Sequence, residues 1–264
     1  MWKVLVSRLK QGHRTLTYPR SEPALPAPYR GLPVLDSSRC PNGCGECAEA
    51  CPTDALVPGD NGIALDLGRC LFCVDCERAC PHGAIRMTQD WHLAGRTRAG
   101  LIISESKMLA RAEALGRELR GLLGRSLKLR EVSAAGCNAC EADVNVLGTV
   151  VFDLGRFGIQ FVASPRHADG LLITGPVSRN MELALRKTYE AVPAPKIVIA
   201  VGACAISGGP YVDSPQVLNG ADAVVPVDLY VPGCPPHPLS ILDGLLRLLG
   251  RLPDIPETAP RPTA

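Results

Sequence analysis

The second half of the chain alternates short apolar runs with longer segments of helical periodicity. Five runs rich in β-branched residues predict strands, at 127–132, 160–162, 170–174, 196–201 and 223–227. Three further segments predict helices, at 138–150, 179–191 and 238–249. Several of the runs are apolar on both faces, as buried parallel strands are. Residues 126–252 are therefore predicted to form an α/β domain with a flavodoxin-like, doubly wound parallel sheet.

The segments outside this domain have less regular patterns. Residues 1–35 are predicted to be an extended lead-in, because five prolines crowd its second half. In the linker, residues 91–125, apolar positions recur at steps of three and four and predict an amphipathic helix between Ser104 and Gly124. These positions are Met108, Ala112, Leu115, Leu119 and Leu122. The proline-rich tail, residues 253–264, is predicted to be disordered.

Composition narrows the class of protein. The 264 residues include 28 basic and 26 acidic side chains, so the formal net charge is only +2 and gives no reason to expect nucleic acid or an anionic membrane as a partner. The N-terminal apolar run is too short for a signal peptide, and no stretch reaches the roughly 18 apolar residues of a membrane span. A cytoplasmic location is therefore predicted, in which the twelve cysteines would be reduced and free to act as ligands.

Eight of the cysteines form an internal repeat within residues 36–90. The two runs are Cys40-x3-Cys44-x2-Cys47-x3-Cys51-Pro52 and Cys70-x2-Cys73-x2-Cys76-x3-Cys80-Pro81. This is the ligand spacing of bacterial ferredoxins with two [4Fe-4S] clusters, in which the fourth cysteine of each run ligates the other cluster. The first run departs from the pattern, because three residues rather than two separate Cys40 from Cys44.

The repeat predicts an α+β ferredoxin domain with two ligand sets. Cluster 1 takes Cys40, Cys44, Cys47 and Cys80, and cluster 2 takes Cys51, Cys70, Cys73 and Cys76. The alternative is a pair of zinc knuckles. The proline after the last cysteine of both runs favours the ferredoxin interpretation.

The other four cysteines lie in the α/β domain. Cys137 and Cys140 stand at a predicted strand-to-helix junction, and Cys204 and Cys234 follow apolar runs in Gly- and Pro-rich loops. Loops at the carboxyl ends of parallel strands gather at one edge of the sheet, so the four thiols are expected to converge. Four thiolates suit zinc or a [4Fe-4S] cluster. One pair with two separate cysteines is unusual for zinc, so cluster 3 is predicted here.

Further motifs surround these four cysteines. They are Cys137-Asn138-Ala139-Cys140-Glu141, Arg156-Phe157-Gly158, Ser164 to Asp169, Gly175 to Arg179, Gly202 to Gly209 and Val231 to Pro236. With them, the segment from about Ser126 to Leu249 resembles the small subunit of energy-converting membrane-bound [NiFe] hydrogenases, as in formate hydrogenlyase, and more distantly the matching subunit of respiratory complex I. The Cys137-x2-Cys140 spacing is similar to the hydrogenase branch. The lead-in resembles a neighbouring ferredoxin-like subunit, so the chain looks like a fusion of the two.

The resemblance implies an oxidoreductase subunit that relays electrons through three [4Fe-4S] clusters to or from a catalytic large subunit. It also implies a further electron-input subunit and a peripheral position on the inner face of the membrane, reached through partner subunits that include a membrane arm. No bond-making site is visible in the chain itself. Two alternatives stay open: a nickel-free quinone oxidoreductase like complex I, and a zinc-stabilised scaffold.

Three charged residues near the predicted third cluster have two interpretations each. The resemblance suggests that Glu141 relays protons beside the large subunit, whereas its spacing from Asn138 predicts a capping box. Arg166 and His167 are interpreted either as a charged turn, which we favour, or as groups that tune the cluster potential. Glu141 and Arg166 are also expected close to the large-subunit contact. Departures from the hydrogenase pattern at Ala139 and Ala142 leave open whether nickel is present in that partner.

Overall fold

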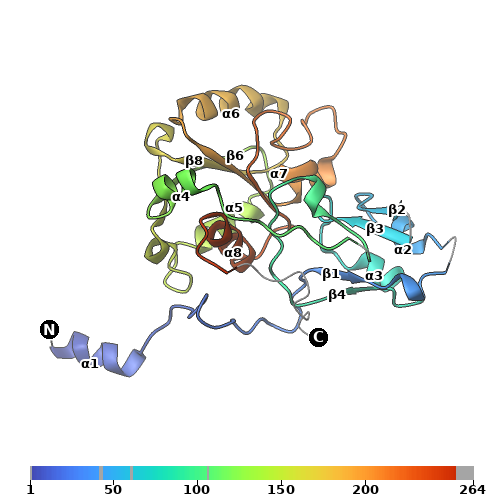
Figure 1. The fold of residues 1–264 in the computed structure, drawn as a ribbon, viewed down its shortest axis with the longest axis horizontal. Helices are drawn as coiled ribbons and strands as arrows, with labels where there is room; N and C mark the ends of the chain where they lie inside the picture. The colour runs from blue at the N-terminus through green and yellow to red at the C-terminus, as the bar shows by residue number, and fades with distance from the viewer. Residues whose placement is uncertain (1, 42–43, 60–61, 106, 254–264) are drawn as a thin grey trace.

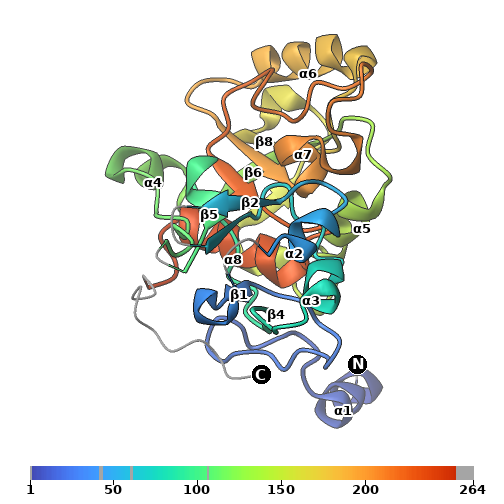
Figure 2. The same ribbon diagram turned by 90° about the vertical axis from the view of Figure 1, so that its right-hand side faces the viewer.

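The computed structural model describes residues 2–41, 44–59, 62–105 and 107–253. An α/β domain occupies one side of the molecule and a smaller cysteine-rich domain packs against it (Figure 1). A helix near the N-terminus projects from the body of the protein (Figures 1 and 2). The tail predicted to be disordered lies, beyond residue 253, outside the described residues.

A five-stranded parallel sheet forms the centre of the α/β domain. Its strands are β6 (Leu127–Ser133), β7 (Ile159–Phe161), β8 (Gly170–Thr174), β9 (Ile197–Val201) and β10 (Leu229–Val231). They lie in the order β10-β9-β8-β6-β7, with every neighbouring pair parallel. This is the flavodoxin-like strand order, whose topological switch point falls between β6 and β8. The predicted fold class is confirmed.

Helices cover both faces of this sheet. They are α5 (Ala139–Val146), α6 (Arg179–Ala191), α7 (Ala203–Ser207) and α8 (Pro238–Leu248). Side chains alternate along each strand, so Leu172 of β8 packs in the core beneath α5 and α8 while Leu171 and Ile173 pack in the core on the opposite face, with α6 and α7. Burying one such side chain stabilises the fold by roughly 2 kcal/mol. Figure 1 shows α6 on one side of the sheet and α5 and α8 on the other.

The strand predicted at 223–227 is wrong. The backbone N–H groups of Val224 and Val225 both donate to the carbonyl of Ala221, so the segment is a turn, and the last strand lies at 229–231. Both valines are buried. Their apolar character therefore reflects packing in the core rather than extended backbone.

The cysteine-rich domain contains two small antiparallel sheets and two short helices. The elements are β1 (Pro33–Leu35), α2 (Glu46–Glu49), β2 (Leu56–Gly59), β3 (Gly62–Asp66), α3 (Asp75–Ala79), β4 (Ile85–Met87) and β5 (Ile102–Ile103). Strand β1 pairs with β4, and β3 pairs with both β2 and β5. Strand β5 comes from the segment predicted as a linker, so that segment completes the second sheet.

Both connecting segments depart from their predictions. Of the helix predicted between Ser104 and Gly124, the described residues form only the part at α4 (Arg117–Leu123), because backbone N–H groups upstream of it bond to distant segments. The N–H of Ala112 donates to the carbonyl of Ala94, and that of Leu115 to Leu248. In the lead-in, predicted to be extended throughout, residues 2–11 form α1 (Trp2–Gln11).

The two domains share one hydrophobic core. Leu65 and Leu101 of the cysteine-rich domain belong to the same buried cluster as Leu171 of β8 and Ile206 of α7. The Ser207 hydroxyl donates to the carbonyl of Gly68 at 2.8 Å. A Cβ atom at Gly68 would lie only 2.7 Å from Ile206 Cγ2, so the backbone can approach α7 this closely only at a glycine. The contact fixes the cysteine-rich domain against the sheet.

A buried ion pair within α8 also bonds to Tyr18 of the lead-in. Asp243 is fully buried and accepts a hydrogen bond at 2.9 Å from Arg247, which is 6% exposed. The Tyr18 hydroxyl donates to the same carboxylate at 2.7 Å. Burial and the Asp243 charge raise the pKa of Tyr18, so it stays a neutral donor. A buried pair of this kind costs several kcal/mol to break, because the remaining charge is left without a partner.

We therefore expect Asp243→Asn to lower the free energy of unfolding by about 3 kcal/mol. The control is Glu182→Gln on α6, because Glu182 and Arg186 form an ion pair with the same four-residue spacing whose side chains are 36% and 47% exposed. That change should cost less than about 0.5 kcal/mol. Urea midpoints of the anaerobically prepared protein measure both. Equal shifts for the two variants would show that burial does not set the strength of the Asp243 pair.

Candidate metal centres

The predicted cluster 1 cysteines lie together. Burial raises the pKa of Cys40, and the neighbouring thiols of Cys44 and Cys80 raise it further. Burial likewise raises the pKa of Cys47, and the thiols of Cys80 and Cys40 raise it further. The loop after Cys40, α2 and the end of α3 therefore bring these four sulfurs into one group, although Cys80 belongs to the second sequence run.

The predicted cluster 2 cysteines form a second group. Burial raises the pKa of Cys70 to about 12, and the charges of Cys76, Cys51 and Cys73 add to the rise. Burial and the charges of Cys73 and Cys51 raise the pKa of Cys76 to about 11. All four sulfurs line one cavity with apolar side chains. The apolar wall shields these sulfurs from water.

Backbone N–H groups point at the sulfurs in equivalent places of the two runs. Ala55 donates to Cys51 Sγ at 3.2 Å, and Ala84 donates to Cys80 Sγ at 3.3 Å. The residue before each alanine has left-handed backbone, with φ of 49° at Asp54 and 61° at Gly83. This turn aims the N–H back at the fourth cysteine. Such hydrogen bonds stabilise a thiolate and raise the reduction potential of the cluster that it holds.

The predicted cluster 3 cysteines converge at the carboxyl edge of the parallel sheet. Cys137 and Cys140 follow β6, Cys204 begins α7 after β9, and Cys234 follows β10. Burial and the charges of Cys234 and Cys137 raise the pKa of Cys204 to about 12. Burial also raises the pKa of Cys140, and the charges of Cys204, Glu141 and Cys234 add to this rise. This group lies beside the switch point, where open α/β sheets bind their ligands.

The loops of the third group turn sharply and pack closely around the Cys140 sulfur. Ala135 and Asn138 have left-handed backbone, with φ of 73° and 71°, and turn the chain sharply between β6 and α5. A Cβ atom at Gly202 would lie 2.5 Å from Cys140 Sγ. Strained backbone of this kind persists where the surrounding structure holds a site in one geometry.

The donor sets fit iron–sulfur clusters, which are held by four thiolates each. Each group holds four thiols, and thiol pKa values raised by burial and by mutual repulsion mean that the thiolates need a cationic centre to form. Tetrahedral zinc requires all its sulfurs about 2.3 Å from the metal, whereas a four-iron cluster spreads them around a larger body.

The three groups follow one another through the molecule. The charge of Cys47 in the first group contributes to the raised pKa of Cys76 in the second, after the nearer thiols of that group. The charge of Cys73 in the second contributes to the raised pKa of Cys234 in the third, after burial and Cys137. Cys73 and Cys234 also line one cleft of about 570 Å³. Arg30 lines this cleft and donates to the carbonyls of Phe72 and Cys73 at 3.1 and 3.3 Å.

Known proteins share both halves of this arrangement. A family model described as "NADH ubiquinone oxidoreductase, 20 Kd subunit" matches residues 137–248, and one described as "4Fe-4S dicluster domain" matches residues 39–85. Probable membrane-bound hydrogenase subunit mbhJ of Pyrococcus furiosus is 42% identical over 149 residues, which cover 56% of this chain and 87% of that protein. The chain belongs to the NADH ubiquinone oxidoreductase 20 Kd subunit family.

Two further relatives represent both branches suggested by the sequence. Formate hydrogenlyase subunit 7 of Escherichia coli is 46% identical over 128 residues, which cover 48% of this chain and half of that protein. An NADH-quinone oxidoreductase subunit of Heliobacterium modesticaldum is 44% identical over 120 residues, which cover 45% of this chain and 69% of that protein. The predicted family is confirmed. The chain is an iron–sulfur subunit of the oxidoreductase type, and the matched segments contain all twelve cysteines.

Within this 20 Kd subunit domain, Glu141 is buried rather than part of a capping box. Its carboxylate accepts hydrogen bonds from the hydroxyls of Ser133 at 2.6 Å and Thr174 at 2.7 Å. Burial alone would raise the pKa of Glu141, but these two hydrogen bonds, together with one from its own backbone N–H, outweigh it and lower the pKa. Asn138 makes no side-chain cap. The capping-box interpretation is wrong, because Asn138 has left-handed backbone and makes no cap, and the Glu141 carboxylate bonds to Ser133 and Thr174 instead.

Arg166 and His167 lie at the amino end of the parallel strands, opposite the edge that carries the cysteines of the 20 Kd subunit domain. They form a 3-10 turn, η4 (Pro165–His167), immediately before β8, and both are exposed. Asp169 exchanges hydrogen bonds with the backbone of Lys128 at the start of β6. The start of a parallel strand lies opposite the edge at which the cysteines gather. This position supports the turn interpretation and contradicts the expectation that Arg166 lies near the third group.

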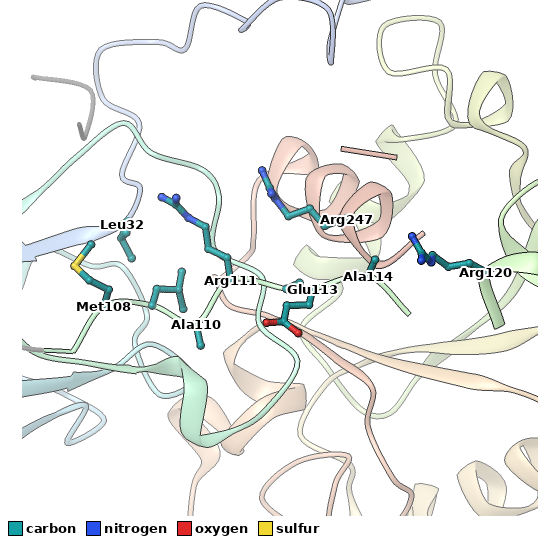
Figure 3. A pocket seen from close by; sticks show the side chains of 10 residues that line it. Leu32, Met108, Ala110, Arg111, Glu113, Ala114, Arg120 and Arg247 are labelled. Carbon is teal, nitrogen blue, oxygen red and sulfur yellow. The ribbon is translucent and has the colours of Figure 1, made fainter. Parts of the chain in front are cut away.

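A large cavity between the linker and α8 is not a cysteine site. It has a volume of about 580 Å³ and is lined by no cysteine among the described residues. Figure 3 shows Arg111 reaching it from the linker, Arg247 from α8 and Arg120 from α4. Arg111 is paired with Asp90 at 2.7 Å and Arg247 with Asp243. Two of the three cations are therefore already neutralised.

Within the described part of the chain, no helix has the length and apolar character to cross a membrane.

Proposed function

We propose that the chain passes electrons through three [4Fe-4S] clusters between an electron-input subunit and a catalytic large subunit. Cys40, Cys44, Cys47 and Cys80 would hold cluster 1, Cys51, Cys70, Cys73 and Cys76 cluster 2, and Cys137, Cys140, Cys204 and Cys234 cluster 3. The observation that carries this proposal is the gathering of twelve cysteines into three groups of four. Each cluster would supply one-electron chemistry, and the chain would supply the position and surroundings of each.

The neighbourhood of the groups supports one order of transfer. Cluster 2 would stand between the other two, since its cysteines are the ones that approach both Cys47 and Cys234. Cluster 1 would then receive electrons from, or deliver them to, the electron-input subunit. Arg30, bonded to the loop of Cys73, would place a positive charge between clusters 2 and 3 and favour the added electron there.

The large subunit would cover cluster 3. Cys137 and Cys234 are exposed, so an uncovered cluster on them would lose electrons to oxygen. Glu141 lies beneath this surface and would form part of a proton path only through its hydroxyl partners, Ser133 and Thr174. The complex would sit peripherally on the inner face of a membrane, because relatives include a membrane-bound hydrogenase subunit.

The associated large subunit distinguishes hydrogenase from quinone reductase chemistry. We expect the complex purified through this chain to contain a large subunit with two Cys-x2-Cys pairs, one near each end, which supply four thiolates for nickel and iron. The complex should reduce dyes with hydrogen, whereas the isolated chain should accept electrons from dyes but turn over no hydrogen. A large subunit without these pairs would support the second candidate, a nickel-free quinone reductase, which the NADH-quinone oxidoreductase relative favours.

A further inference from the structure

Helix α1 is an amphipathic helix with no partner in the described part of the chain. At 100° per residue, Trp2, Leu5, Val6 and Leu9 fall within an arc of about 100°. Three of them are among the most exposed large apolar side chains of the protein, at 77% for Trp2, 56% for Leu5 and 84% for Leu9. None of the ten residues of α1 is buried, and the helix stands clear of the rest of the molecule (Figures 1 and 2). An apolar stripe of this kind normally packs against something.

The charge around the stripe has one sign. Residues 2–20 contain five basic residues and no acidic one, and the first carboxylate is Glu22. Within α1, Lys3 and Lys10 flank one border of the apolar arc and Arg8 stands beyond the other. The net charge of +2 for the whole chain hides this local excess. Lysine and arginine in these positions can lay their aliphatic stems along the apolar face and keep their charged ends in water.

The chain after α1 is fixed to the body beside a second exposed apolar turn. The Thr15 hydroxyl donates to the carbonyl of Val150, and the Leu16 N–H donates to that of Val151, both at 2.8 Å. Arg156 donates to the carbonyls of Leu16 and Tyr18. Val150 is itself 66% exposed. The base of α1 and this turn therefore present apolar side chains from one anchored region of the surface.

We propose that α1 is an anchor that lies in the plane of an anionic lipid surface and holds this subunit against it directly. The apolar arc would enter the boundary between headgroups and acyl chains, with Trp2 in the interfacial zone that tryptophan favours. Lys3, Arg8 and Lys10 would meet lipid phosphates, each contributing on the order of a fivefold gain in binding. Charge complementarity selects lipid over a protein groove, because every charge bordering the arc is positive.

Vesicle binding by the full-length, anaerobically prepared protein tests this assignment. The chain has two tryptophans, of which Trp91 is 5% exposed, so a blue shift of emission reports Trp2. We expect flotation and a blue shift with vesicles of phosphatidylcholine and phosphatidylglycerol at about two to one, and roughly a hundredfold weaker binding to phosphatidylcholine alone. Added salt should weaken binding to the anionic vesicles.

Matched variants separate the stripe from the opposite side of the helix. Leu9→Ser should weaken binding about tenfold, because it removes a side chain that the lipid would cover. Val4→Ser removes an apolar side chain that is 71% exposed but lies outside the arc, and should change binding less than about twofold. The triple change Lys3→Gln, Arg8→Gln and Lys10→Gln should remove the preference for anionic lipid.

Three outcomes would overturn the proposal. They are equal effects of Leu9→Ser and Val4→Ser, equal binding to neutral and anionic vesicles, and no vesicle binding combined with protection of α1 from protease in the purified complex. The last result would identify a protein subunit as the occupant of the apolar face. None of these measurements depends on cluster content, so they are independent of the electron-transfer proposal.

Discussion

We expect the anaerobically purified chain to contain about twelve iron and about twelve acid-labile sulfide per molecule, four of each for every cluster. Twelve cysteines lie in three groups of four, and each group combines loop geometry with thiols that resist ionisation without a cation. Zinc would give a different ratio, at about three metal ions per chain with no sulfide. Iron and sulfide assays, with zinc measured on the same sample, check the prediction.

Intermediate results are informative as well. About eight iron per chain with the spectra of clusters 1 and 2 retained would leave the ferredoxin assignment intact and contradict cluster 3. The same iron content with the spectra of clusters 2 and 3 retained would instead point to the first run, where Cys40 has the wider spacing. About three zinc and no sulfide would contradict electron transfer altogether.

We expect Cys204→Ser to remove only cluster 3 and with it nearly all electron transfer to the large subunit. Cys204 is buried at the start of α7, so no neighbouring thiol can replace it, and a serine oxygen is a poor ligand for this site. Iron should fall by about four per chain. Electron paramagnetic resonance of the reduced protein should lose one of its signals and keep those of clusters 1 and 2.

The same chemical change elsewhere supplies the control. Cys70→Ser should also remove about four iron, but from cluster 2, and should leave the cluster 3 signal in place. Cys234→Ser should repeat the effect of Cys204→Ser at an exposed position, where the substitution does not disturb the core. Unchanged iron content and spectra in both Cys204→Ser and Cys234→Ser would contradict the ligand set for cluster 3.

The core shared by the two domains determines whether a fragment can carry the predicted clusters 1 and 2 without the rest of the chain. Strand β5, from the predicted linker, completes the sheet of the cysteine-rich domain, and Ser207 of α7 bonds to Gly68 two residues before Cys70. The elements that carry the predicted ligands of clusters 2 and 3 therefore touch directly. A fragment of residues 1–90 would lose both supports, so the full chain with single substitutions is the sounder material for assigning clusters.

Several features were determined by the sequence because they depend on local spacing. The two cysteine runs require only a few residues each to define a ligand pattern, and the structure repeats them with the same N–H to sulfur geometry at Cys51 and Cys80. Strands such as β8 were predictable because a run that is buried on both faces must be apolar throughout. Helix α6 was predicted with its observed bounds because its pattern is long and amphipathic.

Other features were decided only by tertiary structure, because they depend on partners far away in the chain. The linker pattern between Ser104 and Gly124 has helical spacing, yet Ala112 and Leu115 give their N–H groups to Ala94 and Leu248, and distant acceptors outweigh local propensity. The burial of Glu141 depends on Ser133 and Thr174, which come from two different strands. Sequence spacing could supply four cysteines for a third centre, but only the parallel order of β6, β9 and β10 brings their loops to one edge of the sheet.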